Sequence, residues 1–121
     1  MGTTSEKLPR ARLIRRRAVF TAARERGRRI TNRWMTLSVL PRDPADPPDR
    51  SEVAFLTPKR IGSAVIRNKL RRRMREIYRR TTGVRHDAYL VWIARPAAAD
   101  LPFAELKECM LTLLRRTDQL A

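Results

Sequence analysis

Apolar and polar residues alternate in one short segment of the first half of the chain. Residues 33–40 place three apolar side chains on one side of an extended backbone: Met35, Leu37 and Val39. This pattern is typical of a strand with one buried face, and the apolar residues 52–57 predict a second strand. Residues 41–51 hold four prolines and three aspartates, which predicts a loop. Because this loop is short, we expect the two strands to form an antiparallel hairpin.

One helix is expected before these strands in the chain and one after them. Residues 18–26 mix small and apolar residues with arginine, and Gly27 is the expected C-terminal cap of a short helix. Ser63 is a candidate N-cap for a longer helix over residues 64–80. The apolar side of that longer helix would carry Ile66, Leu70, Met74, Ile77 and Tyr78.

The last third of the chain predicts a buried strand and a final helix. Residues 88–94 are nearly all apolar, as expected for a strand buried on both faces. Asp100 would cap the final helix and Pro102 would stand in its first turn. The apolar stripe of this helix would be Phe103, Leu106, Met110, Leu113 and Leu114. The approximate order α-β-β-α-β-α predicts an α+β protein, a single-domain α/β sandwich over residues 12–121 after a flexible basic arm, residues 1–11.

The charge of the chain indicates a polyanionic partner. Its 121 residues suit one domain, and 28 Lys and Arg against 12 Asp and Glu give a net charge of +16. Nucleic acid is therefore the favoured partner. No apolar run approaches the ~18 residues of a membrane span, and no signal-peptide core is evident, so we expect a cytoplasmic protein without membrane contact.

The candidate chemistry of the side chains does not favour a protein active site. The chain has one cysteine, Cys109, which excludes an intrachain disulfide and a cysteine-based zinc site. The single histidine, His86, is predicted to be a surface loop residue. We see no carboxylate cluster, P-loop or HExxH motif, so no catalytic or metal-binding residue is assigned. Cys109 is expected to be a small core residue.

The polar side of the helix over residues 64–80 carries the strongest functional signal. Residues 58–80 hold ten basic residues and one acid, Glu76. Arginines at i and i+4 repel each other by a few tenths of a kcal/mol per pair, and a solvated charged surface normally mixes both signs. An external polyanion explains this face better. Guanidinium groups match phosphate oxygens, and Asn68 can both donate and accept hydrogen bonds.

The same segment resembles a family signature. Lys-Arg-Ile-Gly-Ser-Ala-Val at 59–65, followed by Arg-Asn-Lys-Leu-Arg-Arg-Arg-Met-Arg-Glu at 67–76, is similar to the motif of the bacterial ribonuclease P protein component. The resemblance extends over nearly the whole chain except residues 1–11 and 41–51. It implies that the arginine helix lies in a left-handed crossover between parallel strands. It also implies that the helix binds the catalytic RNA through Lys59, Arg60, Arg67, Asn68, Arg71, Arg72 and Arg75.

The resemblance further implies a ribonucleoprotein enzyme whose RNA performs the chemistry. That enzyme removes the 5′ leader of precursor tRNA endonucleolytically, with Mg²⁺ held mainly by RNA. A cleft beside the first helix would receive the leader and would be lined by Phe20, Arg24 and Trp34. Arg24 and Ser38 stand where the family often has aromatic residues. For Trp34 core packing is the favoured role, and the cleft is the alternative.

Two other functions are compatible with the charge. A non-enzymatic RNA-binding protein of ribosomal type has similar size and charge but needs no leader cleft. A membrane-active cationic protein would need an exposed amphipathic helix, whereas both apolar stripes of this chain are needed for its core. No obligate protein partner is apparent from the sequence.

Overall fold

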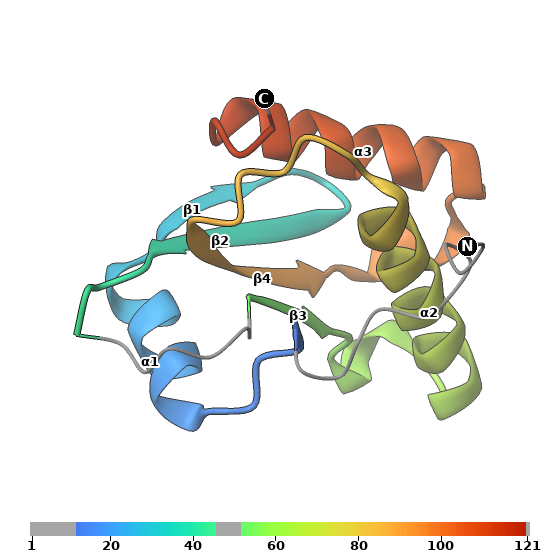
Figure 1. The fold of residues 1–121 in the computed structure, drawn as a ribbon. Coiled ribbons are helices and arrows are strands. Elements are labelled where there is room, and N and C mark those ends of the chain that lie inside the picture. The colour runs from blue at the N-terminus through green and yellow to red at the C-terminus, as the bar shows by residue number, and fades with distance from the viewer. Residues whose placement is uncertain (1–11, 46–51, 121) are drawn as a thin grey trace, which may run out of the picture.

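The computed structural model describes residues 12–45 and 52–120. Within these residues the protein is a mixed α+β structure with a four-stranded sheet and three α-helices (Figure 1). The strands are β1 (Arg28–Thr31), β2 (Met35–Pro41), β3 (Val53–Leu56) and β4 (Ala88–Ala94). The helices are α1 (Arg17–Arg26), α2 (Ala64–Arg80) and α3 (Phe103–Arg116), with short 3-10 helices at Lys59–Ile61 and Pro96–Asp100. The predicted arm, residues 1–11, lies outside the described residues.

The strand order β1-β2-β4-β3 corrects the predicted hairpin. β2 does not pair with β3, because β4 lies between them, antiparallel to β2 and parallel to β3. The physical reason is burial. β4 is apolar at every position, so it stabilises the sheet most at its centre, where both of its faces are covered. β2 pairs instead with β1, a strand that sequence reasoning missed because Ile30 is its only large apolar residue.

Helices cover both faces of the sheet and create two apolar cores. α2 and α3 pack on one face, where Leu37, Trp92 and Met110 are completely buried. α1 packs on the other face, where Val19 and Ala23 contact a smaller cluster that includes Val91. The predicted burial of Met35, Leu37 and Val39 and the two-sided burial of residues 88–94 are confirmed. The opposite face of β2 is also covered, because Ser38 is buried against α1.

The ends of the helices follow the sequence in part. The Ser63 side chain accepts a hydrogen bond from the Ile66 backbone N–H at 3.3 Å, which confirms the predicted N-cap. The predicted cap at Asp100 is wrong, because Asp100 ends a 3-10 helix and α3 starts after Pro102 without a side-chain cap. Ile66 was expected in the buried stripe but is 43% exposed, since α2 reaches the sheet only from Leu70 onward.

α2 connects the parallel strands β3 and β4, as the family resemblance implies. The left-handedness of that crossover stays a prediction. No helix in the described residues is sufficiently long and apolar to cross a membrane.

Candidate nucleic-acid interface

The first candidate surface, which we call the arginine face, consists of Lys59, Arg60, Arg67, Asn68, Arg71, Arg72 and Arg75. Lys59 and Arg60 are exposed in the 3-10 helix that follows β3. Gly62 links this turn to α2. Its φ is 152°, a backbone conformation that residues other than glycine rarely adopt. Its carbonyl accepts a hydrogen bond from Arg67 Nε at 3.2 Å, so the turn also orients the first arginine of the face.

Arg71 donates two hydrogen bonds to other side chains. Its Nη1 donates to Asn68 Oδ1 at 3.0 Å and its Nη2 donates to Thr57 Oγ1 at 2.6 Å, at the end of β3. These neutral partners hold the guanidinium in place and leave its charge uncompensated. Arg72 is exposed, and Arg75 is half-buried with an Nε that has no hydrogen-bond partner in the described residues. The described residues thus place a row of uncompensated positive charge along one side of α2.

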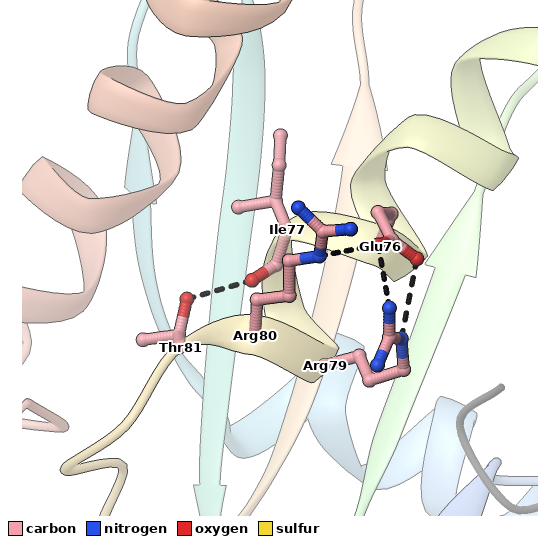
Figure 2. A network of polar contacts seen from close by, with 5 residues as sticks. All are labelled: Glu76, Ile77, Arg79, Arg80 and Thr81. Atoms are coloured by element: carbon pink, nitrogen blue, oxygen red, sulfur yellow. Dashed lines mark hydrogen bonds and ion pairs between the residues drawn. The ribbon is translucent and has the colours of Figure 1, made fainter. Parts of the chain in front are cut away.

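The C-terminal turn of α2 differs, because its arginines are paired with a carboxylate (Figure 2). Glu76 Oε2 lies 2.6 Å from Arg79 Nη2 and 2.5 Å from Arg80 Nε. The hydrogen bond from Arg79 is the main cause that lowers the pKa of Glu76. Thr81 Oγ1 donates to the Ile77 carbonyl at 2.7 Å and closes the helix. No described acidic residue forms an ion pair with the arginine face, so α2 presents its unpaired charge at the N-terminal side.

The second candidate surface is a groove of about 500 Å³ between α1 and the sheet. Phe20 and Arg24 both line it, as predicted from the sequence. Leu56, which is 37% exposed, contributes to an apolar floor together with Val91 and Ile93 of β4. Arg17 and Arg29 add positive charge at the groove. An apolar floor beside guanidinium groups suits a single-stranded nucleic acid, whose bases stack on apolar side chains and whose phosphates attract arginine.

Trp34 does not lie in this groove, so its predicted place in the cleft is wrong and the favoured core-packing role is confirmed. It precedes β2 and packs against the core on the side of α2 and α3, where it lines a different cavity with Cys109. Ser38 does line the groove, and its buried hydroxyl donates to the Ala23 carbonyl at 2.9 Å. The side chain of Ser38 thus binds α1 to the sheet.

Sequence reasoning missed several groove residues, among them Arg17, Arg29 and Leu56. Arg17 lies three residues before Phe20 and seven before Arg24, so helical spacing offered a signal for it. Arg29 and Leu56 come from strands at opposite edges of the sheet, and only the strand order shows that both border one groove.

His86 is a half-exposed residue that contacts the buried Glu52. Its Nδ1 lies 2.7 Å from Oε2 of the buried Glu52, and the Tyr78 hydroxyl donates to the same oxygen. Arg12 Nη1 lies 3.4 Å from Glu52 Oε1. Burial, followed by the hydrogen bond to Glu52, raises the pKa of Tyr78. The described residues contain no group of three or more His, Cys, Asp or Glu side chains that could hold a metal ion.

Comparisons with known proteins agree on one family. The sequence model of a protein family described as ribonuclease P matches residues 8–118 of this chain. The chain is 34% identical over 110 residues to the ribonuclease P protein component of Symbiobacterium thermophilum, covering 90% of this chain and 93% of that protein. It is 38% identical over 112 residues to the ribonuclease P protein component of Desulfovibrio desulfuricans, covering 90% of this chain and 85% of that protein.

Two solved structures have the same fold. The RNase P protein of Staphylococcus aureus superposes with a TM-score of 0.78 at 21% identity, covering 92% of this chain and 99% of that one. The RNase P protein of Thermotoga maritima gives a TM-score of 0.71 at 25% identity, covering 86% of this chain and 96% of that one.

Proposed function

The chain belongs to the ribonuclease P family, as the protein component of that ribonucleoprotein, and we propose that its arginine face and its groove bind two different RNA segments. The arginine face binds the catalytic RNA. The groove binds the 5′ leader of precursor tRNA. The observation that supports this division most strongly is the groove itself, because an RNA-binding module without a substrate needs no apolar floor beside its basic residues.

The arginine face suits a folded RNA. Arg67, Arg71 and Arg75 follow at four-residue spacing, so their guanidinium groups line one side of α2. Guanidinium groups bind phosphate oxygens in a bidentate manner, and each neutralised phosphate releases counterions. Asn68 adds a group that can read a 2′-hydroxyl or a base edge.

The groove suits a short single strand that leaves the folded RNA. Phe20 can stack on a base, and Arg24 offers a guanidinium plane or a phosphate contact where relatives often have a second aromatic residue. The two surfaces meet at the end of β3, where Leu56 lines the groove and Thr57 accepts a hydrogen bond from Arg71. A leader in the groove would therefore lie next to RNA bound on the arginine face.

The hydrolysis itself is assigned to the RNA subunit. Mg²⁺, a hard cation that prefers oxygen ligands, is held mainly by RNA phosphates and supplies the charge stabilisation for phosphodiester cleavage. The protein screens phosphate repulsion with its net charge of +16 and holds the leader in place. We place this activity in the cytoplasm.

Cleavage of precursor tRNA at low Mg²⁺ by a bacterial ribonuclease P RNA, with and without this chain, tests the proposal. We expect faster cleavage with a correct mature 5′ end when the chain is present, and no cleavage by the chain alone. A charge-matched variant with an altered groove, Phe20→Ala, should stimulate cleavage less.

Each alternative predicts a different result. Tight RNA binding without stimulation of a cognate RNA would contradict the proposal and favour a ribosomal-type RNA-binding protein. Cleavage by the chain alone would contradict the assignment of the chemistry to RNA.

A further inference from the structure

A second cavity, of about 300 Å³, lies between α3 and the segment that joins β1 to β2. It is on the face of the sheet that α3 covers, whereas the groove is on the α1 face. Trp34 and Leu101 contribute apolar surface to the cavity, and Glu105 and Glu108 contribute carboxylates. Its volume is at the lower end of that of small-molecule sites and suits a single side chain.

Asn32 holds the two walls of the cavity together. Its Oδ1 accepts hydrogen bonds from the backbone N–H groups of Trp34 and Met35 at 2.8 and 2.9 Å. Its Nδ2 donates to Cys109 Sγ on α3 at 3.2 Å. One side chain therefore fixes the tryptophan segment against α3. The cavity is formed before any ligand binds, which lowers the entropic cost of binding.

The charge of the cavity is opposite to that of the protein. Glu105 and Glu108 are three residues apart on α3, so their carboxylates lie on the same side of the helix. In the described part of the chain neither forms an ion pair, although the sequence holds 28 Lys and Arg. By contrast, Glu52 and Glu76 are both paired with arginine. Unpaired carboxylates repel phosphates, so this cavity is unsuited to RNA and attracts a cation.

We propose that this cavity binds an arginine side chain from a basic segment of another protein. A guanidinium group can stack on the face of Trp34 and form a bidentate pair with Glu105 or Glu108. Its methylene groups can contact Leu101. The planar guanidinium fits this arrangement better than the compact ammonium of lysine. The site leaves the arginine face and the groove free, so the protein could bind RNA and this partner together.

A pair of short peptides tests the chemistry of the site. Acetyl-Gly-Arg-Gly-amide carries the proposed group, and the same peptide with citrulline in place of arginine is nearly isosteric but uncharged. The readout is the indole N–H resonance of Trp34 in NMR spectra. The other tryptophan, Trp92, is 0% exposed and serves as an internal reference. We expect a saturable shift of the Trp34 resonance with the arginine peptide and none with the citrulline peptide.

Charge-matched variants separate this site from general electrostatics. Glu105→Gln/Glu108→Gln removes both carboxylates of the cavity, whereas Glu25→Gln/Asp118→Asn removes two exposed carboxylates outside it. We expect the first variant to weaken binding of the arginine peptide by about tenfold or more, because charge-assisted hydrogen bonds are lost. The second should change it by less than about twofold.

Several results would overturn the proposal. Equal shifts with both peptides, or no saturable shift, would show that the cavity does not recognise arginine. Equal weakening by both variant pairs would show that only net charge matters. Concentration-dependent dimerisation that is lost in Glu105→Gln/Glu108→Gln would assign the cavity to a second copy of this chain. Because these measurements contain no RNA, they are independent of the proposed RNA-binding function.

Discussion

Phe20 and Arg24 lie one turn apart on α1 and line the same groove. Phe20 is half-buried, so one side of its ring packs on the sheet while part of it faces the groove. Arg24 is exposed and adds charge to the same site. At the scale of single residues, the proposed function depends on a few side chains. Their removal changes RNA binding without creating a cavity in the core.

Replacement of Phe20 tests the groove directly. We expect Phe20→Ala to weaken binding of precursor tRNA to the ribonucleoprotein by about 1–3 kcal/mol, because one base loses its stacking partner. Mature tRNA, which has no leader, should be affected much less. Phe103→Ala is the matched control, since Phe103 is a partly exposed phenylalanine on α3 outside the groove. Equal losses for precursor and mature tRNA in filter-binding assays would exclude the leader assignment.

Replacement of arginines on α2 tests the arginine face. We expect Arg67→Ala and Arg72→Ala each to weaken binding to the catalytic RNA and to lower the log–log salt slope by about one unit, because each removes one phosphate contact. Arg115→Ala, at the exposed end of α3, changes net charge equally and should retain the slope. Salt titrations of binding provide the measurement, and an unchanged slope in both α2 variants would mean that RNA binds elsewhere.

At the scale of elements, two close contacts hold the helices on the sheet. Gly27 ends α1 with an ordinary φ of −71°, so its conformation does not require glycine. A Cβ at this position would lie 2.4 Å from the Ala23 carbonyl oxygen and 2.5 Å from Ser38 Oγ. Gly27 is thus needed for the close approach of α1 to β2. The end of α2 is held by the hydrogen bond between Tyr78 and Glu52.

The close approach at Gly27 predicts a stability effect. Gly27→Ala should lower the free energy of unfolding by about 2 kcal/mol, because the added methyl group overpacks the contact. In Gly27→Ala/Ser38→Ala one of the two clashing atoms is absent, so the double variant should be less destabilised than the sum of the single variants. Urea unfolding of all three variants gives these values. Strict additivity would show that Ser38 does not limit the space at residue 27.

The raised pKa of Tyr78 predicts a specific alkaline effect. Below the ordinary tyrosine pKa of about 10 the proton is present in both folded and unfolded chains. Above it the unfolded chain loses the proton while folded Tyr78 keeps it. The stability then falls with rising pH, by up to about 1.4 kcal/mol per pH unit.

Tyr78→Phe isolates this contribution. At pH 8 the variant should be about 1–3 kcal/mol less stable, because the buried Glu52 loses a hydrogen-bond donor. Between pH 10 and pH 11.5 its stability should fall less steeply than that of the unaltered chain. Urea unfolding at a series of pH values measures both effects. If stability falls equally steeply with pH in the two proteins, Tyr78 is not the cause of the alkaline effect.

At the scale of the whole molecule, the two RNA-binding surfaces that we propose meet at the β3 edge of the sheet. Leu56 belongs to the groove, and the next residue, Thr57, contacts the arginine face through Arg71. β3 is an edge strand of the sheet, so its C-terminal end adjoins both surfaces. The cavity at Trp34 lies away from this junction, against α3.

This arrangement predicts separable defects. With the catalytic RNA saturated by protein, Arg72→Ala should retain the preference for precursor over mature tRNA within about twofold. Phe20→Ala should retain its affinity for the catalytic RNA within the same limit, because Phe20 and Arg72 lie on helices on opposite faces of the sheet and share no described partner. Binding of each variant to both RNAs provides the comparison. Loss of both functions in either variant would show that the two surfaces act as one site.

The sequence alone determined the features that depend on near neighbours. The helix over residues 64–80, its Ser63 cap and the apolar strand 88–94 follow from periodicity and capping, which act over a few residues. The arginine face was likewise visible, because five of its seven members lie on one helix and the other two shortly precede it. The family resemblance implied that Phe20 and Arg24 line one cleft, and both line the groove.

Only the tertiary structure decided which strands pair and which distant side chains meet. Local alternation cannot specify that β4 separates β2 from β3, because the gain comes from burying β4 on both faces by α1 on one side and by α2 and α3 on the other. The strand order then brings Leu56 and Arg29 to one groove and leaves Trp34 outside it. Contacts between distant residues depend on the whole packing, so no local pattern encodes them.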